Sequence, residues 1–268
     1  MKLAIAIIDA FTNQTFRGNP AATILVDRFP EDFQMQQIAA EMNLSETAFV
    51  KPLEKNWFQL RWFTPKQEVP LCGHATLAIA HYLRELEVID TKSPLIFSTL
   101  SGDLKISFEE RLIVMDFPAT VYRTCSERSQ QVLAEIFCDR PYECLGQAED
   151  YIAVTLESES AVRYFQPQYD LIAQLDGFGF IVTAIADRHQ SYDFVSRFFA
   201  PKAGIPEDPV TGSAHCSLTP YWAKCLGKST LKAKQLSARS GELEVCDLHT
   251  RILLKGEAVT FLRGEITY

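Results

Sequence analysis

The 268-residue sequence contains no hydrophobic stretch long enough to cross a membrane. Its first apolar run, residues 3–8, is ended by Asp9 and falls far short of the ~20 residues that a transmembrane helix needs. The run is also shorter than the apolar core of a secretory signal peptide. We therefore expect a buried first strand here, and neither a membrane anchor nor an export signal.

The chain also lacks an excess of positive charge. It has 26 Lys and Arg against 34 Asp and Glu, a formal net charge of −8, which argues against a nucleic-acid or anionic-membrane partner. Its seven cysteines are odd in number and include no C-x-x-C pair, so neither a disulfide framework nor a zinc knuckle is indicated. Together these features predict a cytoplasmic protein.

Several catalytic fingerprints are missing. There is no G-x-G-x-x-G after a strand, no G-x-x-x-x-G-K-[ST] and no G-x-S-x-G, so dinucleotide-binding, phosphate-loop and α/β-hydrolase sites are not offered. His74 and His81 stand seven residues apart on one expected helix, about 10 Å, too far to share a metal ion. We expect no cofactor and no metal, which leaves proton chemistry.

The most informative stretch is residues 61–83, RWFTPKQEVPLCGHATLAIAHYL. An aromatic run ends a strand, Pro65 and Pro70 keep the loop out of helix, and an alanine-rich, largely buried helix is predicted from Gly73. The N–H groups and dipole at such a helix start favour a carboxylate or an oxyanion. The simpler interpretation is that Gly73 only turns the chain and His74 only caps the helix.

A second copy of this stretch favours the anion-binding interpretation over the simpler one. The run RFFAPK at 197–202 matches RWFTPK at 61–66, and PVTGSA at 209–214 matches PLCGHA at 70–75. The two spacings, 136 and 139, differ by a three-residue insertion, and a second helix follows to a stop at Gly227. The repeat predicts two similar domains, residues 1–120 completed by a last strand at 258–268, and residues 121–257. Their two helix starts are expected to face one cleft that holds a small anion.

Hydrophobic periodicity predicts the remaining elements. Helices are expected at residues 31–42, 126–137 and 158–165, and strands at residues 2–9, 22–27, 95–98, 103–108, 112–117, 151–156, 179–186, 192–199, 231–239, 243–247, 251–255 and 258–268.

Three polar residues in these patterns allow more than one interpretation. Glu46 opens an apolar run at 44–50, where it is either a surface residue or a general acid/base whose pKa the apolar neighbours raise. Cys72 at a helix start could act as a base, but its counterpart in the second copy is Thr211, which disfavours a two-cysteine epimerase. Ser213 stands where plain helix capping is the simplest role.

Taken together, these motifs resemble the PhzF-like family of phenazine-biosynthesis isomerases, within the diaminopimelate-epimerase fold. The resemblance runs over nearly the whole chain. Where an Arg-Gly-Gly or Arg-Pro-Gly turn would be commoner, this chain has Arg239-Ser240-Gly241. The matching segments are Asp9-Ala10-Phe11, Gly18-Asn19-Pro20-Ala21, residues 43–49, Phe63-Thr64-Pro65, Gly73-His74-Ala75-Thr76 and residues 208–215.

The resemblance implies an α+β protein with two hotdog-like halves, each a mostly antiparallel sheet wrapped around a central helix, and a homodimer. It also implies cofactor-free proton transfer on a small carboxylate-bearing substrate. Glu46 would be the general acid/base, and His74 and Asp208 would hydrogen-bond the substrate and assist. The substrate-binding set would be Gly18, Asn19, Gly73, Gly212 and Ser213.

Two alternatives stay open. One is a one-cysteine epimerase or dehydratase that uses Cys72, and the other is a small-molecule binding protein without catalysis. The sequence names no substrate for any of the three.

Overall fold

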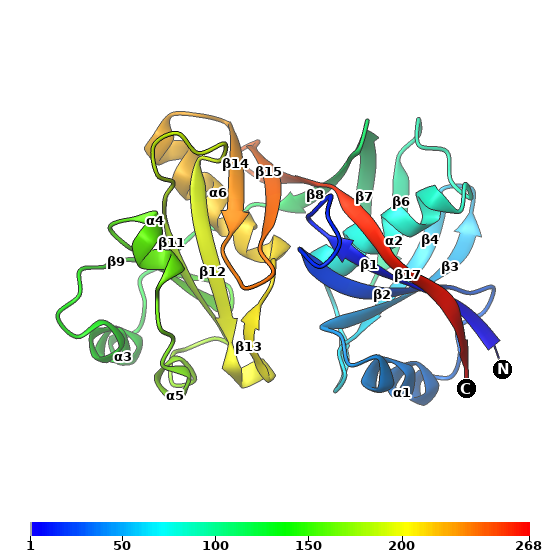
Figure 1. Cartoon of the computed structure of the whole chain (residues 1–268), viewed down its shortest axis with the longest axis horizontal. Helices are drawn as coiled ribbons and strands as arrows, with labels where there is room; N and C mark the ends of the chain where they lie inside the picture. Colours follow the sequence, from blue (N-terminus) through cyan, green and yellow to red (C-terminus); the bar gives the residue numbers. More distant parts are fainter. Residues whose placement is uncertain (1) are drawn as a thin grey trace. The chain divides into compact units, whose positions relative to one another are not determined.

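A computed structural model describes residues 2–268, which form two compact units (Figure 1). The first unit contains the chain up to Phe117 together with Leu253–Tyr268, and the second is Pro118–Ile252. The expected boundaries, at residues 120 and 258, lie close to these. Within residues 2–268, no helix combines the length and the apolar character that crossing a membrane requires.

The sheet of the first unit begins with β1, which pairs antiparallel with both β2 and β17. β2 runs parallel to β3 because α1 (Asp32–Met42) carries the chain back between them. β4 is antiparallel to β3 and β5 and parallel to β6, and β6, β7 and β8 then follow as antiparallel neighbours. The strands are β1 (Lys2–Ala10), β2 (Asn19–Leu25), β3 (Glu46–Glu54), β4 (Trp57–Phe63), β5 (Glu68–Val69), β6 (Leu95–Thr99), β7 (Gly102–Glu109), β8 (Leu112–Pro118) and β17 (Ala258–Thr267).

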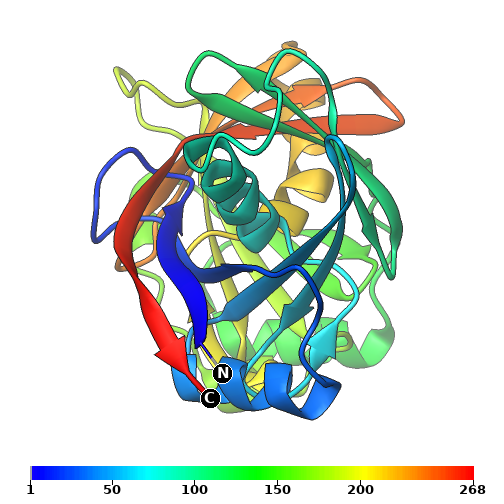
Figure 2. The same cartoon turned by 90° about the vertical axis from the view of Figure 1, so that its right-hand side faces the viewer.

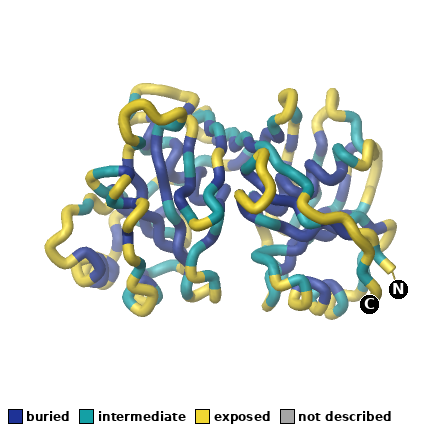
Figure 3. Tube along the Cα trace, viewed as in Figure 1, coloured by how far each residue is buried: buried dark blue, intermediate teal, exposed yellow. Residues whose placement is uncertain are grey.

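Helix α2 (Gly73–Glu85) lies inside this curved sheet, as Figure 2 shows for the unit that faces the viewer. All ten residues from His74 to Leu83 are buried, and the corresponding trace is dark blue in Figure 3. Small side chains allow the close approach. A Cβ added at Gly256 would meet the Phe11 ring at 2.6 Å and Leu77 Cδ1 at 2.9 Å.

The second unit repeats this order around helix α6 (Gly212–Leu226). β9 is antiparallel to β10, and β10 is parallel to β11. β12 is antiparallel to both β11 and β13. β12 is also parallel to β14, and β14 pairs antiparallel with β15. The other elements are α3 (Glu127–Phe137), β9 (Glu143–Ala148), β10 (Tyr151–Thr155), α4 (Glu159–Arg163), α5 (Tyr169–Ile172), β11 (Gly179–Ile185), β12 (Phe194–Ala200), the 3₁₀ helix η1 (Pro201–Ala203), β13 (Ile205–Asp208), β14 (Thr230–Gln235) and β15 (Gly241–Asp247). Strand β16 (Arg251–Gly256) crosses the boundary, and its residues from Leu253 on belong to the first unit.

The repeated motif therefore corresponds to repeated structure. In the first unit Arg61 donates two hydrogen bonds to Glu68, both 2.7 Å, and in the second Arg197 does the same to Glu207 at 2.7 and 2.9 Å. The three-residue insertion of the second copy lies in the segment that contains η1. The predicted α+β class, with a sheet wrapped around a central helix in each half, is confirmed.

Several expected elements need correction. The strand expected at 231–239 ends at Gln235, because Ser240 turns the chain back: its hydroxyl donates to the Gln235 carbonyl and its N–H donates to the Ser237 hydroxyl, both at 3.0 Å. The helix expected at 158–165 ends at Arg163, and α5 follows separately. β9 and β13 were not expected: β9 is half exposed and interrupted at Gly146, and β13 contains Pro206, so neither shows the usual alternation of a strand.

Candidate active site

Glu46 is the first residue of β3, and this strand is paired on both sides, with β2 and with β4. The residue therefore does not stand on an exposed edge, which was the surface interpretation of the sequence. Its side chain is 13% exposed. A carboxyl group held at the end of an interior strand, with little contact with water, suits proton transfer better than solubility.

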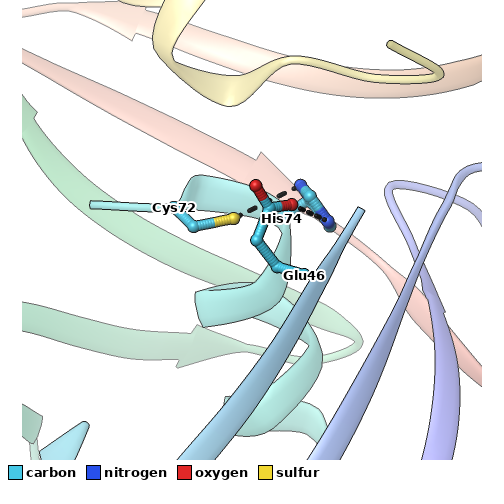
Figure 4. A group of neighbouring side chains, drawn as sticks. All are labelled: Glu46, Cys72 and His74. Atoms are coloured by element: carbon cyan, nitrogen blue, oxygen red, sulfur yellow. Dashed lines mark hydrogen bonds and ion pairs between the residues drawn. The ribbon is translucent and has the colours of Figure 1, made fainter. Parts of the chain in front are cut away.

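His74 lies in the first turn of α2 and meets Glu46 there, as Figure 4 shows. Its Nε2 is 3.2 Å from Glu46 Oε2. This is a contact by distance, because Nε2 has no partner with hydrogen-bond geometry among the described residues. Burial lowers the pKa of His74 to about 3, so the imidazole is neutral near pH 7 and the pair is not an ion pair.

Cys72 is the N-cap residue of α2, with extended backbone angles of φ −149° and ψ 115°. Its side chain makes no capping hydrogen bond, and Sγ lies 3.5 Å from His74 Nδ1. One donor atom from each of Glu46, Cys72 and His74 falls within 4.8 Å of the others, a spacing that would also accommodate one divalent cation that accepts sulfur, nitrogen and oxygen.

In the second unit, Asp208 ends β13 and is 8% exposed. Its carboxylate Oδ2 accepts a hydrogen bond from Thr211 Oγ1. The buried amide of Gln235 braces the same turn: Nε2 donates to the Asp208 carbonyl at 2.7 Å, and Oε1 accepts from the Thr211 N–H at 2.9 Å. These bonds hold the carboxylate beside the start of α6.

Gly212 and Ser213 are the first two residues of α6, and Thr211 is its N-cap. The Ser213 hydroxyl lies 2.8 Å from the Tyr151 hydroxyl, to which it is hydrogen-bonded. Burial raises the pKa of Tyr151, so the phenol stays protonated near neutral pH. One of the two hydroxyl protons forms the bond between the side chains, and the other can be donated to a ligand. The start of α6 thus combines backbone N–H groups with two hydroxyls.

The Gly18–Asn19 turn has a structural reason of its own. Gly18 has φ 64°, and a Cβ there would lie 2.1 Å from the carbonyl oxygen of Ala10, so only glycine fits. Asn19 is fully buried where β2 begins, paired with Ala10. A binding role for either residue stays a prediction.

The sequence reasoning missed Gln235, Tyr151 and the contact of Cys72 with His74. Gln235 could have been recognised from the sequence, because it follows Leu231 and Ala233 on the inward side of an alternating strand, where a polar residue is unusual. No sequence pattern indicates the role of Tyr151, because 62 residues separate it from its partner Ser213. Ser240, which replaces the commoner glycine or proline, is held in its left-handed turn by a hydrogen bond from its hydroxyl to the Gln235 carbonyl at 3.0 Å.

With this geometry in place, comparison with known proteins is informative. The family model described as phenazine biosynthesis-like protein matches residues 8–264. An uncharacterized isomerase of Pseudomonas aeruginosa is 48% identical and one of Halalkalibacterium halodurans is 43% identical, each over 99% of both chains. The crystal structure of a PhzF family phenazine biosynthesis protein from Enterococcus faecalis superposes with a TM-score of 0.90 at 38% identity, covering 100% of both chains.

The chain therefore belongs to the phenazine biosynthesis-like (PhzF) family, as the resemblance of its motifs predicted.

Proposed function

We propose that this protein is a cofactor-independent isomerase in which Glu46 moves a proton within a small carboxylate-bearing substrate. Isomerase is the class that the uncharacterized relatives carry in their names. The observation that supports the chemistry is the contact of 3.2 Å between Glu46 Oε2 and a neutral, buried His74 Nε2. A carboxylate next to a neutral hydrogen-bonding group is a suitable pair for taking up and returning one proton.

In this mechanism the Glu46 carboxylate removes a proton from a substrate carbon, and the electron pair of the broken C–H bond moves into an enolate. The backbone N–H groups at the start of α2, beginning at Gly73, would stabilise the developing oxyanion. Glu46 then returns a proton to another carbon, so no external acid, base or oxidant is consumed. Exchange of the carboxyl proton of Glu46 with solvent between the two steps carries deuterium into the product when the reaction runs in heavy water. His74 would donate a hydrogen bond from Nε2 to the substrate while Glu46 carries the proton, because the neutral acid no longer attracts that N–H as the carboxylate does.

For the second unit we propose substrate recognition. The N–H groups of Gly212 and Ser213, with the Ser213 and Tyr151 hydroxyls, offer donors to a carboxylate or carbonyl. Asp208 would accept a hydrogen bond from the substrate, because Thr211 and Gln235 hold its carboxylate and backbone in place. Gly18 and Asn19 would complete the binding set.

The first prediction concerns Glu46→Gln. The amide keeps the shape of the side chain but has no basic oxygen, so we expect turnover to fall by about 10²–10⁴-fold. The measurement is mass-spectrometric deuterium incorporation from heavy water into a panel of small cyclic and amino-acid carboxylates. Glu54→Gln is the matched control, since Glu54 lies on the same strand but is exposed, and it should leave incorporation unchanged.

Other outcomes separate the alternatives. Full incorporation by Glu46→Gln together with its loss in both Cys72→Ala and Cys72→Ser would favour the one-cysteine epimerase. Tight binding of a panel compound without any hydrogen exchange would favour a binding protein. The homodimer implied by the resemblance is tested separately, by light scattering of the purified protein.

A further inference from the structure

The chemistry proposed for Glu46 leaves the Cys72 thiol without a role, although Sγ is hydrogen-bonded to His74 Nδ1 at 3.5 Å. Both side chains are buried. A neutral imidazole carries a proton on only one of its nitrogens, and the contacts of the two nitrogens decide which one. The contacts of Cys72 and Glu46 with the ring therefore define the tautomer of His74.

The contact with Glu46 determines which nitrogen of the His74 ring carries the proton. An ionised carboxylate only accepts hydrogen bonds, so the nitrogen that lies 3.2 Å from Glu46 Oε2 must be the one that carries the proton, Nε2–H. The opposite tautomer would place a lone pair against a carboxylate oxygen. Nδ1 is then an acceptor, and the Cys72 S–H is the donor. Burial disfavours the alternative of an imidazolium beside a thiolate, because it lowers the pKa of His74 to about 3.

We propose that Cys72 is a positioning residue whose S–H donates to His74 Nδ1 and holds His74 in its Nε2–H tautomer. The inference rests on the proposed function, in which the thiol acts at the step where Glu46 holds the substrate proton. Once Glu46 has taken the substrate proton it is a neutral acid, which can donate as well as accept and no longer selects a tautomer. Cys72 keeps Nε2 occupied by a proton, so the proton on Glu46 returns to the substrate and does not pass to His74.

The local backbone allows this role. Cys72 is the N-cap residue, yet its side chain makes no capping hydrogen bond, so the orientation of the thiol toward His74 does not compete with helix capping. The Cys72 carbonyl accepts the first helical hydrogen bond from the Thr76 N–H at 3.2 Å and a second one from Thr76 Oγ1, so the backbone of this turn is held independently of the thiol. Replacing the thiol therefore changes the environment of Nδ1 without removing a cap.

The test is ¹⁵N nuclear magnetic resonance of the histidine rings in the full chain at pH 7, with a chelator present to exclude bound metal. Glu46→Gln serves as the background because its neutral amide imitates the protonated acid and cannot select a tautomer by charge. His74→Gln identifies the His74 signals. We expect Nε2–H in Glu46→Gln and in Glu46→Gln/Cys72→Ser, whose hydroxyl can still donate, and loss of that pattern in Glu46→Gln/Cys72→Ala.

Glu46→Gln/Cys216→Ala is the matched control, since it removes a different buried thiol and should leave the His74 signals unchanged. Retention of the Nε2–H pattern in the Cys72→Ala double variant would overturn the proposal, and so would its absence in Glu46→Gln alone. Should the double variant not fold, the comparison of Cys72→Ser with Cys72→Val in the same background answers the question. The measurement needs no substrate, so it stands or fails independently of the role of Glu46 in catalysis.

Discussion

Two cysteine side chains of the second unit, Cys125 and Cys144, lie with their sulfur atoms 3.4 Å apart. Cys125 is buried just before α3, whereas Cys144 is exposed on β9. The hydrogen bond between the two sulfur atoms lowers the pKa of Cys144 to about 7, while the same bond and burial raise the pKa of Cys125. Cys144 is therefore the more reactive thiol of the pair, and Cys125 is the less reactive one.

We therefore predict that Cys144 reacts first with iodoacetamide at pH 7, several-fold faster than the other exposed cysteines, Cys138 and Cys225. A lowered pKa means that thiolate is present at a lower pH, and the thiolate is the reacting species. Peptide mapping by mass spectrometry measures the order. Cys125→Ala should slow alkylation of Cys144, because the hydrogen bond that lowers the pKa of Cys144 is lost. Unchanged reactivity in this variant would contradict the explanation.

At the scale of elements, each unit has an Arg–Glu pair that links two antiparallel strands before its central helix, β4 to β5 in the first unit and β12 to β13 in the second. The side chains of Arg61 and Glu68 are 18% and 25% exposed, and those of Arg197 and Glu207 are 11% and 19% exposed. Arg197 also donates to the carbonyl of Phe165 at 2.8 Å, whereas Arg61 also donates to the carboxylate of the exposed Asp32 at 2.7 Å. Removal of Arg197 therefore leaves its partners less accessible to water than removal of Arg61, whose partner Asp32 is exposed and can bond to solvent.

Accordingly, we expect Arg197→Ala to lower the free energy of unfolding by about 2–3 kcal/mol and Arg61→Ala by about 1–2 kcal/mol. Urea denaturation followed by circular dichroism gives both values. Lys2→Ala is the control, since both partners of the Lys2–Glu265 pair are more than half exposed and its loss should cost less than about 0.5 kcal/mol. A larger loss for Arg61→Ala than for Arg197→Ala would contradict the argument from burial.

Helix α6 shows how an element accommodates a residue that local rules disfavour. Pro220 lies inside the helix and has no N–H to offer the carbonyl of Cys216, four residues earlier. That carbonyl accepts a hydrogen bond from the N–H of Thr120 at 3.1 Å instead. The helix therefore continues to Leu226 and ends at Gly227, which takes φ 65° as the sequence predicted for a glycine stop.

At the scale of the whole molecule, buried histidines connect stability to pH. His215 is fully buried in α6, where its Nδ1 donates to the Thr211 carbonyl at 2.8 Å. Burial lowers the pKa of His215 to about 4, against about 6.5 in an unfolded chain. Between these values the unfolded state binds a proton that the folded state does not, so stability falls as the pH falls from about 6.5 to about 4.

The corresponding prediction is that His215→Gln, which keeps a side-chain donor, shows a shallower loss of stability than the wild type over this pH range. One such group contributes on the order of 3 kcal/mol at most. Unfolding free energies from urea titrations at several pH values between 4 and 7 measure the difference. The exposed His249 provides the control, and His249→Gln should follow the wild-type curve. Parallel curves for the wild type and His215→Gln would refute the assignment.

The sequence by itself determined the duplicated architecture, because the same order of arginine, two prolines and glycine before an apolar helix occurs twice, with a three-residue insertion in the second copy. It also determined both central helices, whose apolar periodicity and glycine ends are local properties. Glu46, His74 and Asp208 were named from their motifs, and the structure adds that Glu46 and His74 are in contact. β9 and β13 could not be predicted, since tertiary pairing overrides their weak local patterns.

Only the tertiary structure decided which side chain each of these groups contacts. The bond between Gln235 and Thr211 joins residues 24 apart, and the bond between Tyr151 and Ser213 joins residues 62 apart. Cys72 and His74 are only two residues apart in the sequence, yet their contact depends on the extended backbone of the N-cap residue, which directs the thiol toward Nδ1. Periodicity and propensity describe a residue's own element, whereas burial, tautomer and pKa are set by whatever the fold brings next to it.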